Sequence, residues 1–153
     1  MRTPTILRYV SILYRYSQIY LARRLKPLHS SAGLYPFILA VCRQPGMNQE
    51  SLSDLLVMDK GTTAKAVKEL ELKGCIVRKP DQSDRRTNRL YPTTQGEALR
   101  DELDVFLLEW KEILWKGFSD SEKTQSYDLM MRMAANARSH VVAERDIAAT
   151  PSE

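Results

Sequence analysis

The sequence predicts a mainly α-helical domain that carries one small β-hairpin. Two observations support this fold class. Over residues 48–74, apolar residues recur with helical spacing in two short segments that a very short link separates. After Gly74 the pattern becomes extended over residues 75–79 and 88–91, with turn-forming residues between them. Two helices joined by so tight a turn must cross steeply, so this segment is predicted to be a helix-turn-helix followed by a wing.

Length and composition favour one domain. The chain has 153 residues, and its 43% hydrophobic content is enough to form a core. We expect the domain to span residues 1–143, with the winged helix-turn-helix at 34–92, and a frayed tail at 144–153, where the composition turns small and polar. No apolar run is long enough to span a bilayer and no signal peptide is visible, so we expect a cytoplasmic protein without a membrane partner.

The N-terminal segment, residues 6–28, has the apolar spacing of a long helix. This helix is apolar on two faces and needs two packing partners, of which so small a chain supplies one and a second copy supplies the other. One face comprises Leu7, Val10, Tyr14, Ser17, Leu21 and Leu28, and the other comprises Ile6, Leu13 and Tyr20 with Tyr9 and Tyr16. Proline and small residues then break the helix, and an almost wholly apolar helix over residues 37–43 is expected inside.

The helix-turn-helix has clear helix-start signals. Asn48 is the expected N-cap of its first helix, whose apolar face is expected to be Leu52, Leu55 and Leu56, and Asp59 is the expected N-cap of the second. In the second helix, Thr63, Ala66, Val67 and Leu70 form one inward stripe. Its other side carries short or basic side chains, which leave room for a second surface: Lys60, Gly61, Thr62, Lys65 and Lys68.

The predicted wing is a basic hairpin. Its tip carries Arg85 and Arg86, with Arg89 close behind. Asp84 is placed to brace a guanidinium. A planar, always-charged arginine on a narrow hairpin suits a minor groove, where A·T-rich DNA concentrates negative potential.

Two further helices are expected after the wing. Thr93 or Thr94 caps the first, and Ser119 with Glu122 forms a capping box for the last. The inward stripe of the first runs from Leu99 to Leu114, and that of the last comprises Tyr127, Met130, Met131, Ala134, Ala137 and Val141. The apolar surplus on the terminal helices indicates a two-fold dimer.

Residues 52–96 resemble the winged helix of the MarR family of bacterial and archaeal transcription regulators. Three patterns in family order carry the resemblance: Leu70, Glu71, Lys73 and Gly74; Pro80, Asp81, Asp84, Arg85 and Arg86; Thr93 and Gly96. The flanking helices extend the likeness over nearly the whole chain. The sequence departs from the family at Pro92, usually leucine, and at Cys75, usually apolar; both concern the strands and not the DNA face.

The resemblance implies a homodimeric DNA-binding regulator, more often a repressor, with dimerisation helices at 4–29 and 93–143 and a pseudopalindromic operator on double-stranded DNA. The expected DNA-binding residues are Asn48, Lys60, Gly61, Thr62, Lys65, Lys68, Asp84, Arg85, Arg86 and Arg89. The resemblance also implies a pocket for a small aromatic effector, whose identity the sequence does not give. From their order along the chain, the residues expected to line it are Tyr14, His29, Tyr35 and Trp110.

The net charge of +4 is unevenly distributed along the chain. Residues 1–43 carry +7, residues 44–91 carry +2 and residues 92–153 carry −5. Two interpretations stay open. The basic first helix packs against acidic terminal helices of its own chain or of a partner, or it adds to the attraction for DNA phosphates.

Other function classes are weighed against the regulator. Cys42 and Cys75 lie among apolar residues and form neither a disulfide framework nor a CxxC half-site, and the family's peroxide sensors place their cysteine near the start of the first helix, where this chain has none. His29 and His140 lack neighbours at metal-ligand spacing. A small cysteine-dependent enzyme therefore lacks its base and orienting group, and we expect neither an enzyme nor a cofactor. A winged helix that binds proteins in place of DNA is the other alternative, against which the basic wing argues.

Overall fold

The computed structural model describes residues 5–84 and 86–149. The chain divides into two compact units, residues 1–110 and 111–153. Its elements follow the order α1 (Ile6–Leu25), the 3-10 helix η1 (Lys26–Leu28), α2 (Tyr35–Arg43), β1 (Met47–Asn48), α3 (Gln49–Leu56), α4 (Lys60–Leu72), β2 (Ile76–Pro80), β3 (Asn88–Pro92), α5 (Thr94–Leu114) and α6 (Asp120–Ala149). The predicted fold class is confirmed: a mainly helical chain with a small antiparallel sheet.

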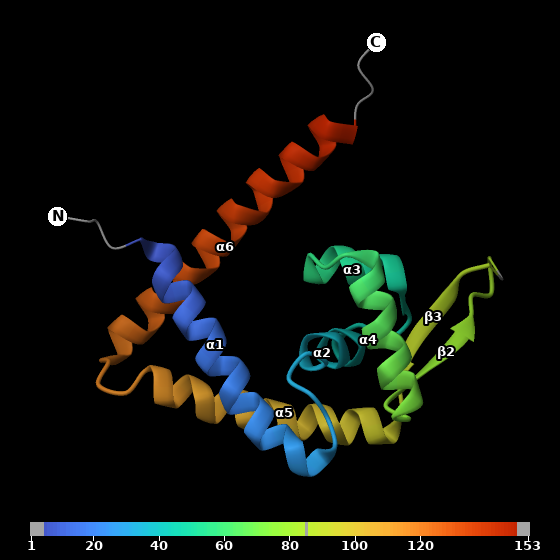
Figure 1. Ribbon diagram of the computed structural model, residues 1–153, viewed down its shortest axis with the longest axis horizontal. Helices are drawn as coiled ribbons and strands as arrows, with labels where there is room; N and C mark the ends of the chain where they lie inside the picture. Colours follow the sequence, from blue (N-terminus) through green and yellow to red (C-terminus); the bar gives the residue numbers. More distant parts are fainter. Residues whose placement is uncertain (1–4, 85, 150–153) are drawn as a thin grey trace. The chain divides into compact units, whose positions relative to one another are not determined.

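The first unit holds the winged helix-turn-helix. Helix α4 contacts α2, α3 and β2, and Figure 1 shows it beside the β2–β3 hairpin. The hairpin pairs Ile76 with Pro92 at its base and Pro80 with Asn88 near its tip. A short strand that the sequence did not predict, β1, pairs with the free edge of β3, so that the strand order is β1-β3-β2. The wing is therefore attached to the segment just before α3 as well as to α4.

The core of this unit is continuous through its helices and sheet. The predicted inward stripe of α4 is confirmed, since Thr63, Ala66, Val67 and Leu70 are all buried. Around it lie Leu21 and Leu25 of α1, Phe37, Ile38 and Val41 of α2, Leu52 of α3, Ile76 and Leu90 of the hairpin, and Leu99 and Leu103 of α5. This burial fixes which side of α4 faces outward.

Several expected inward positions are exposed in the single chain. Leu55 is 39% exposed, because only Leu52 and Leu56 of α3 reach the core. On α1, Leu7 and Tyr14 are exposed, whereas Leu21 and Leu25 near its end are buried. On α6, Tyr127, Met130 and Met131 are exposed, as is Val141. The described part of the chain therefore leaves these apolar positions uncovered.

Two helix ends differ from the sequence-based boundaries. Helix α1 ends at Leu25 and continues as a tighter 3-10 turn that contains Pro27, because proline removes a backbone donor from the α-helical pattern. Helix α6 continues to Ala149 and so includes residues 144–149, which we expected to be frayed. That stretch contains Glu, Arg and Ala, which are good helix formers.

Among the described residues, no helix is both long and apolar enough to cross a membrane.

The turn between α3 and α4 is strained at Val57. Its φ is +53°, a left-handed conformation that a β-branched side chain rarely adopts, and the side chain is 58% exposed. We expect Val57→Asn to raise the free energy of unfolding by about 1 kcal/mol, because asparagine tolerates this conformation and little packing is lost. Urea denaturation measures the change. The control Val77→Asn, at an extended position of β2, should lower stability; equal losses in both variants would contradict the prediction.

Candidate nucleic-acid interface

The start of α4 is fixed by its cap. Asp59 accepts a bond from the backbone nitrogen of Thr62 at 2.7 Å and another from the Thr62 hydroxyl at 2.6 Å. Both bonds lower the pKa of Asp59, and the bond from the hydroxyl has the larger effect. The cap satisfies free backbone donors of the first turn and holds the exposed side of α4 in one orientation. All five predicted residues of that side are exposed: Lys60, Gly61, Thr62, Lys65 and Lys68.

The helix before it is capped in the same way. Asn48 Oδ1 accepts a bond from the backbone nitrogen of Ser51 at 2.7 Å, which confirms the predicted N-cap. Asn48 also belongs to β1, opposite Arg89. The start of α3 is thus held by both its own cap and the sheet.

A groove of about 350 Å³ separates the helix-turn-helix from the wing. It is lined by Asn48, Gln49, Glu50, Ser53, Lys60, Arg78, Arg86, Thr87, Asn88 and Leu90. The structure therefore brings together three of the predicted site residues, Asn48, Lys60 and Arg86, from three separate segments. Basic side chains at one concave surface attract a polyanion.

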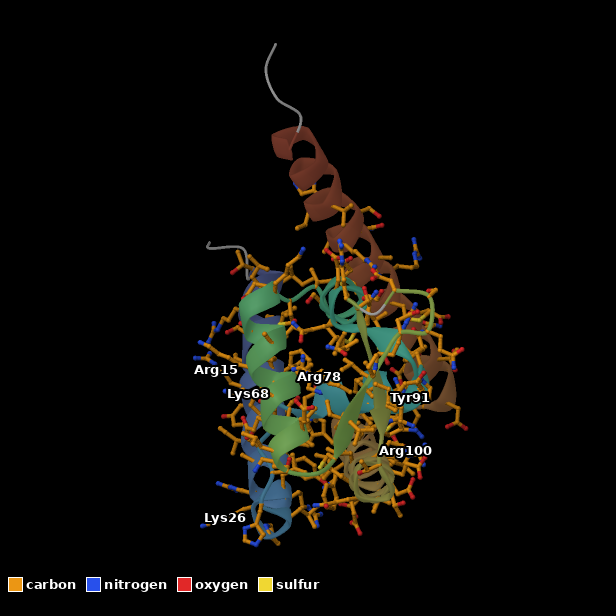
Figure 2. The ribbon with its side chains drawn as sticks, turned by 90° about the vertical axis from the view of Figure 1, so that its right-hand side faces the viewer. Arg15, Lys26, Lys68, Arg78, Tyr91 and Arg100 are labelled. Atoms are coloured by element: carbon orange, nitrogen blue, oxygen red, sulfur yellow. The ribbon has the colours of Figure 1, made fainter. Side chains whose placement is uncertain are left out.

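Two cations of this groove are held by carboxylates. Lys60 Nζ lies 2.6 Å from Glu50 Oε1. Arg78 reaches from β2 toward α4, where its Nε donates to Glu71 Oε2 at 3.1 Å (Figure 2). Sequence reasoning did not predict Glu50, Arg78 or Glu71 as site residues, although Glu71 belongs to one of the family patterns. The register of the hairpin, which pairs Arg78 with Leu90, is what turns Arg78 toward the helices.

The wing tip is organised by Asp81. Its Oδ1 accepts bonds from the backbone nitrogen and hydroxyl of Ser83 at 2.7 and 2.6 Å, and its Oδ2 accepts from Arg89 Nε. The bonds from Ser83, and then that from Arg89, hold the pKa of the Asp81 carboxyl well below its usual range. Arg89 also donates through Nη1 to the Gly46 carbonyl at 3.1 Å. Arg89 thereby ties the wing to the turn before β1.

Asp84, which was predicted to brace a guanidinium, accepts from the backbone nitrogen of Arg86 at 3.0 Å and from the Thr87 hydroxyl at 3.2 Å, so it shapes the turn that presents Arg86. Among the described residues of the wing tip, Asp81 holds the guanidinium of Arg89. The side chain of Asp84 is short and folds back on its own turn. Within the described residues, the guanidinium of Arg86 has no ion-pair partner, and its side chain is exposed. Arg85 lies outside the described residues.

The outer face of the wing is distinct from the groove. Lys79, Arg89 and Tyr91 lie on this face, where the ammonium of Lys79 lies 5.0 Å from the centre of the Tyr91 ring. They line a second hollow of about 440 Å³ together with Pro45, Gly46, Pro80, Asp81 and Gln82. Among the predicted DNA-binding residues that the structure describes, only Arg89 lines this hollow. Lys60 and Arg86 line the groove instead.

Among the described residues, the four residues expected to bind an effector make different contacts. Burial, and then the charge of Tyr14, raise the pKa of Tyr35. Trp110 stacks on Tyr20 at 4.8 Å and donates to the Ser17 hydroxyl at 2.8 Å. His29 ends η1, and its carbonyl accepts from Lys73 Nζ at 2.6 Å. None of the four lines either of the two hollows.

Both cysteine thiols are weakly acidic. Burial raises the pKa of Cys42 to about 11, and burial also raises the pKa of Cys75. No group of three His, Cys, Asp or Glu residues in the described part of the chain is placed to hold a metal ion.

We expect Cys42 to react slowly with iodoacetamide at pH 7.5, since a raised pKa leaves the thiol protonated and the thiolate is the nucleophile. Its rate, followed by mass spectrometry, should keep rising through pH 10, whereas the urea-unfolded chain should level off near the ordinary cysteine pKa of about 8.5. A folded protein whose Cys42 rate levels off below pH 9 would contradict the assignment.

Comparisons with known proteins agree with this geometry. Residues 39–87 match the model of the MarR family. The uncharacterized HTH-type transcriptional regulator YybA of Bacillus subtilis is 30% identical over 72% of this chain and 74% of its own length. The crystal structure of a MarR transcriptional regulator from Methanosarcina mazei is 38% identical and superposes with a TM-score of 0.82, covering 86% of this chain and 95% of that one. A MarR-family regulator from Listeria monocytogenes, complexed with a 26mer DNA, shares the fold at 22% identity with a TM-score of 0.87, covering 99% of each chain.

Proposed function

Because this chain belongs to the MarR family of transcriptional regulators and is not an enzyme, we propose that it binds a pseudopalindromic DNA operator as a homodimer. The observation that carries the proposal is the groove in which Asn48, Lys60 and Arg86 meet beside the exposed basic side of α4. In this proposal α4 enters the major groove and Arg86 enters the neighbouring minor groove. A regulator of the same fold that is complexed with a 26mer DNA supports DNA as the partner.

Exposed apolar residues support the homodimer. On α1 they include Ile6, Leu7, Tyr9, Val10, Leu13, Tyr14, Tyr16 and Ile19, and on α6 they include Tyr127, Leu129, Met130, Met131, Met133, Val141 and Val142. Large apolar side chains exposed in such numbers along a helix mark an interaction site. We assign residues 4–29 and 93–143 to the dimer interface, with the winged helix-turn-helix at 34–92. A two-fold dimer places its two α4 helices about 34 Å apart, one turn of DNA.

The regulator is proposed to act in the cytoplasm as a repressor that a small aromatic ligand releases. In the dimer, Tyr14, His29, Tyr35 and Trp110 are the proposed ligand contacts. Such a ligand shifts the protein between DNA-binding and released conformations only if it binds the two with different affinity. Its coupling to DNA is therefore measured as the ratio of operator affinities with and without the compound.

In vitro selection of duplexes from a random pool, with the full-length protein and readout by sequencing, tests the proposal. The expected result is an enriched inverted repeat with half-sites about ten base pairs apart. The control is the same selection with a variant in which Lys60, Lys65 and Lys68 are replaced by alanine. A pool that stays random in the wild-type selection, with only weak and salt-sensitive binding, would contradict sequence-specific recognition.

A further inference from the structure

Glu50 places a negative charge within the proposed DNA surface. We propose that Glu50 is a positioning residue that directs the ammonium of Lys60 to a base edge and away from the phosphates, which raises specificity at the expense of affinity. The inference rests on the proposed DNA binding. Its basis is the ion pair between Glu50, in the first turn of α3, and Lys60, the first residue of α4, at 2.6 Å.

The ion pair is poorly suited to a stabilising role. The side chains of Lys60 and Glu50 are 68% and 65% exposed, and exposed pairs contribute little to folding. The first turn of α3 already has the Asn48 cap. The bond from Lys60 lowers the pKa of Glu50, so the carboxylate is ionised at neutral pH. A permanent negative charge is thus kept at the surface, where the N-terminus of α3 rather than the ion pair gives it a small stabilising role.

The charge is unfavourable for general attraction to DNA. Among the residues that line the groove, Lys60, Arg78 and Arg86 are cationic and Glu50 is the one carboxylate. A carboxylate close to phosphates lowers the affinity for every sequence alike, because it cancels part of the counterion-release term. That cost is offset only if Glu50 improves the choice between sequences.

Restraint of Lys60 supplies such an improvement. The N-terminal residues of a recognition helix reach base edges, which is where Lys60 lies. A lysine is a flexible point charge, and an unrestrained one beside DNA is drawn to the nearest phosphate. Glu50 competes with the phosphates for this ammonium and leaves it directed at the bases. Since lysine donates to O6 and N7 of guanine, each half-site should contain one guanine that depends on this pair.

A double-mutant cycle tests the inference. The wild type, Glu50→Gln, Lys60→Met and the double variant are titrated with the selected duplex, with the same duplex carrying A·T at the guanine position, and with an unrelated duplex, over a range of salt. For Glu50→Gln we expect the preference for guanine to fall about tenfold. Affinity for the unrelated duplex should rise, with a salt dependence steeper by about 0.9, as one more phosphate is contacted. In the Lys60→Met background, Glu50→Gln should leave the guanine preference unchanged.

Two controls separate positioning from charge and from stability. Asp54→Asn removes the same charge from α3, outside the groove lining, and should keep the guanine preference. Thermal unfolding of each variant checks the fold. The inference is wrong if Glu50→Gln raises the affinity for all three duplexes by the same factor. It is also wrong if Glu50→Gln changes the guanine preference equally in the Lys60→Met background. If the wild type selects no duplex, both the proposed function and this inference are wrong. If a duplex is selected and Glu50→Gln keeps the wild-type guanine preference on it, only the inference is wrong.

Discussion

A Gly96→Ala variant is expected to lose at least about 3 kcal/mol of unfolding free energy, a large fraction of the about 5–15 kcal/mol that stabilises a folded domain. A Cβ atom at this position would lie 2.0 Å from the carbonyl oxygen of Cys75 and 3.2 Å from Ile38 Cδ1. The clash is with backbone. Helix α5 therefore packs against the start of the wing at a distance that only glycine permits.

The obstructing carbonyl has little freedom to move. The oxygen of Cys75 accepts from the backbone nitrogen of Thr93 at 3.0 Å, and the nitrogen of Cys75 donates to Leu70 at 2.9 Å. A shift that relieved the clash would break the junction between α4, the wing and α5. The measurement is urea denaturation of Gly96→Ala beside Gly33→Ala, whose new methyl group would meet its nearest atom at 4.0 Å. Gly33→Ala should be neutral or slightly stabilising; if both variants unfold at the wild-type urea concentration, the predicted clash does not exist.

Local signals allowed much of the fold to be predicted. The inward stripe of α4 and the caps Asn48 and Asp59 depend on residues a few positions apart, so helical spacing and side-chain chemistry are enough to find them. Strand β1 could not be found in this way. It consists of two residues, too few for an alternating pattern, and it exists because β3 presents an edge beside it.

The contacts of the candidate site depend on how elements meet. The pairing of Asp81 with Arg89 requires the register of the hairpin, whereas the sequence pattern placed the brace at Asp84. The Glu50–Lys60 pair requires the crossing of α3 and α4, which spacing alone does not specify. Residue types thus indicated which surface is basic, while the partner of each charge came from the three-dimensional arrangement.

Some residues of α1 and of α6 that were predicted to face inward are exposed, for a third reason. Apolar periodicity predicts that a face is buried without saying by which chain, so Tyr14 and Met130, which the sequence placed on apolar packing faces, are exposed in the single chain. The same argument applies to the expected effector residues, which are divided between separate contacts in the single chain.

Arg86→Ala is expected to weaken binding to the selected duplex by about 10- to 100-fold, the loss typical of one specific arginine contact. The guanidinium of Arg86 is exposed at the wing, and the backbone nitrogen of the same residue is held by Asp84 at 3.0 Å. The side chain is thus presented outward on an ordered turn. Because, within the described residues, it has no ion-pair partner, its removal should leave the urea midpoint unchanged.

Flanking sequence separates minor-groove insertion from contact with a phosphate. A narrow A·T-rich minor groove attracts arginine more strongly than a G·C-rich one, so wild-type affinity should fall when the flanks of the selected duplex are changed from A·T to G·C. Arg86→Ala should be insensitive to that change. Arg43→Ala, which removes an exposed arginine from the end of α2, is the matched control and should keep both the affinity and the flank preference. If Arg86→Ala and Arg43→Ala weaken both duplexes by the same small factor, the wing contributes only general charge, and sequence recognition must then be assigned to α4 alone.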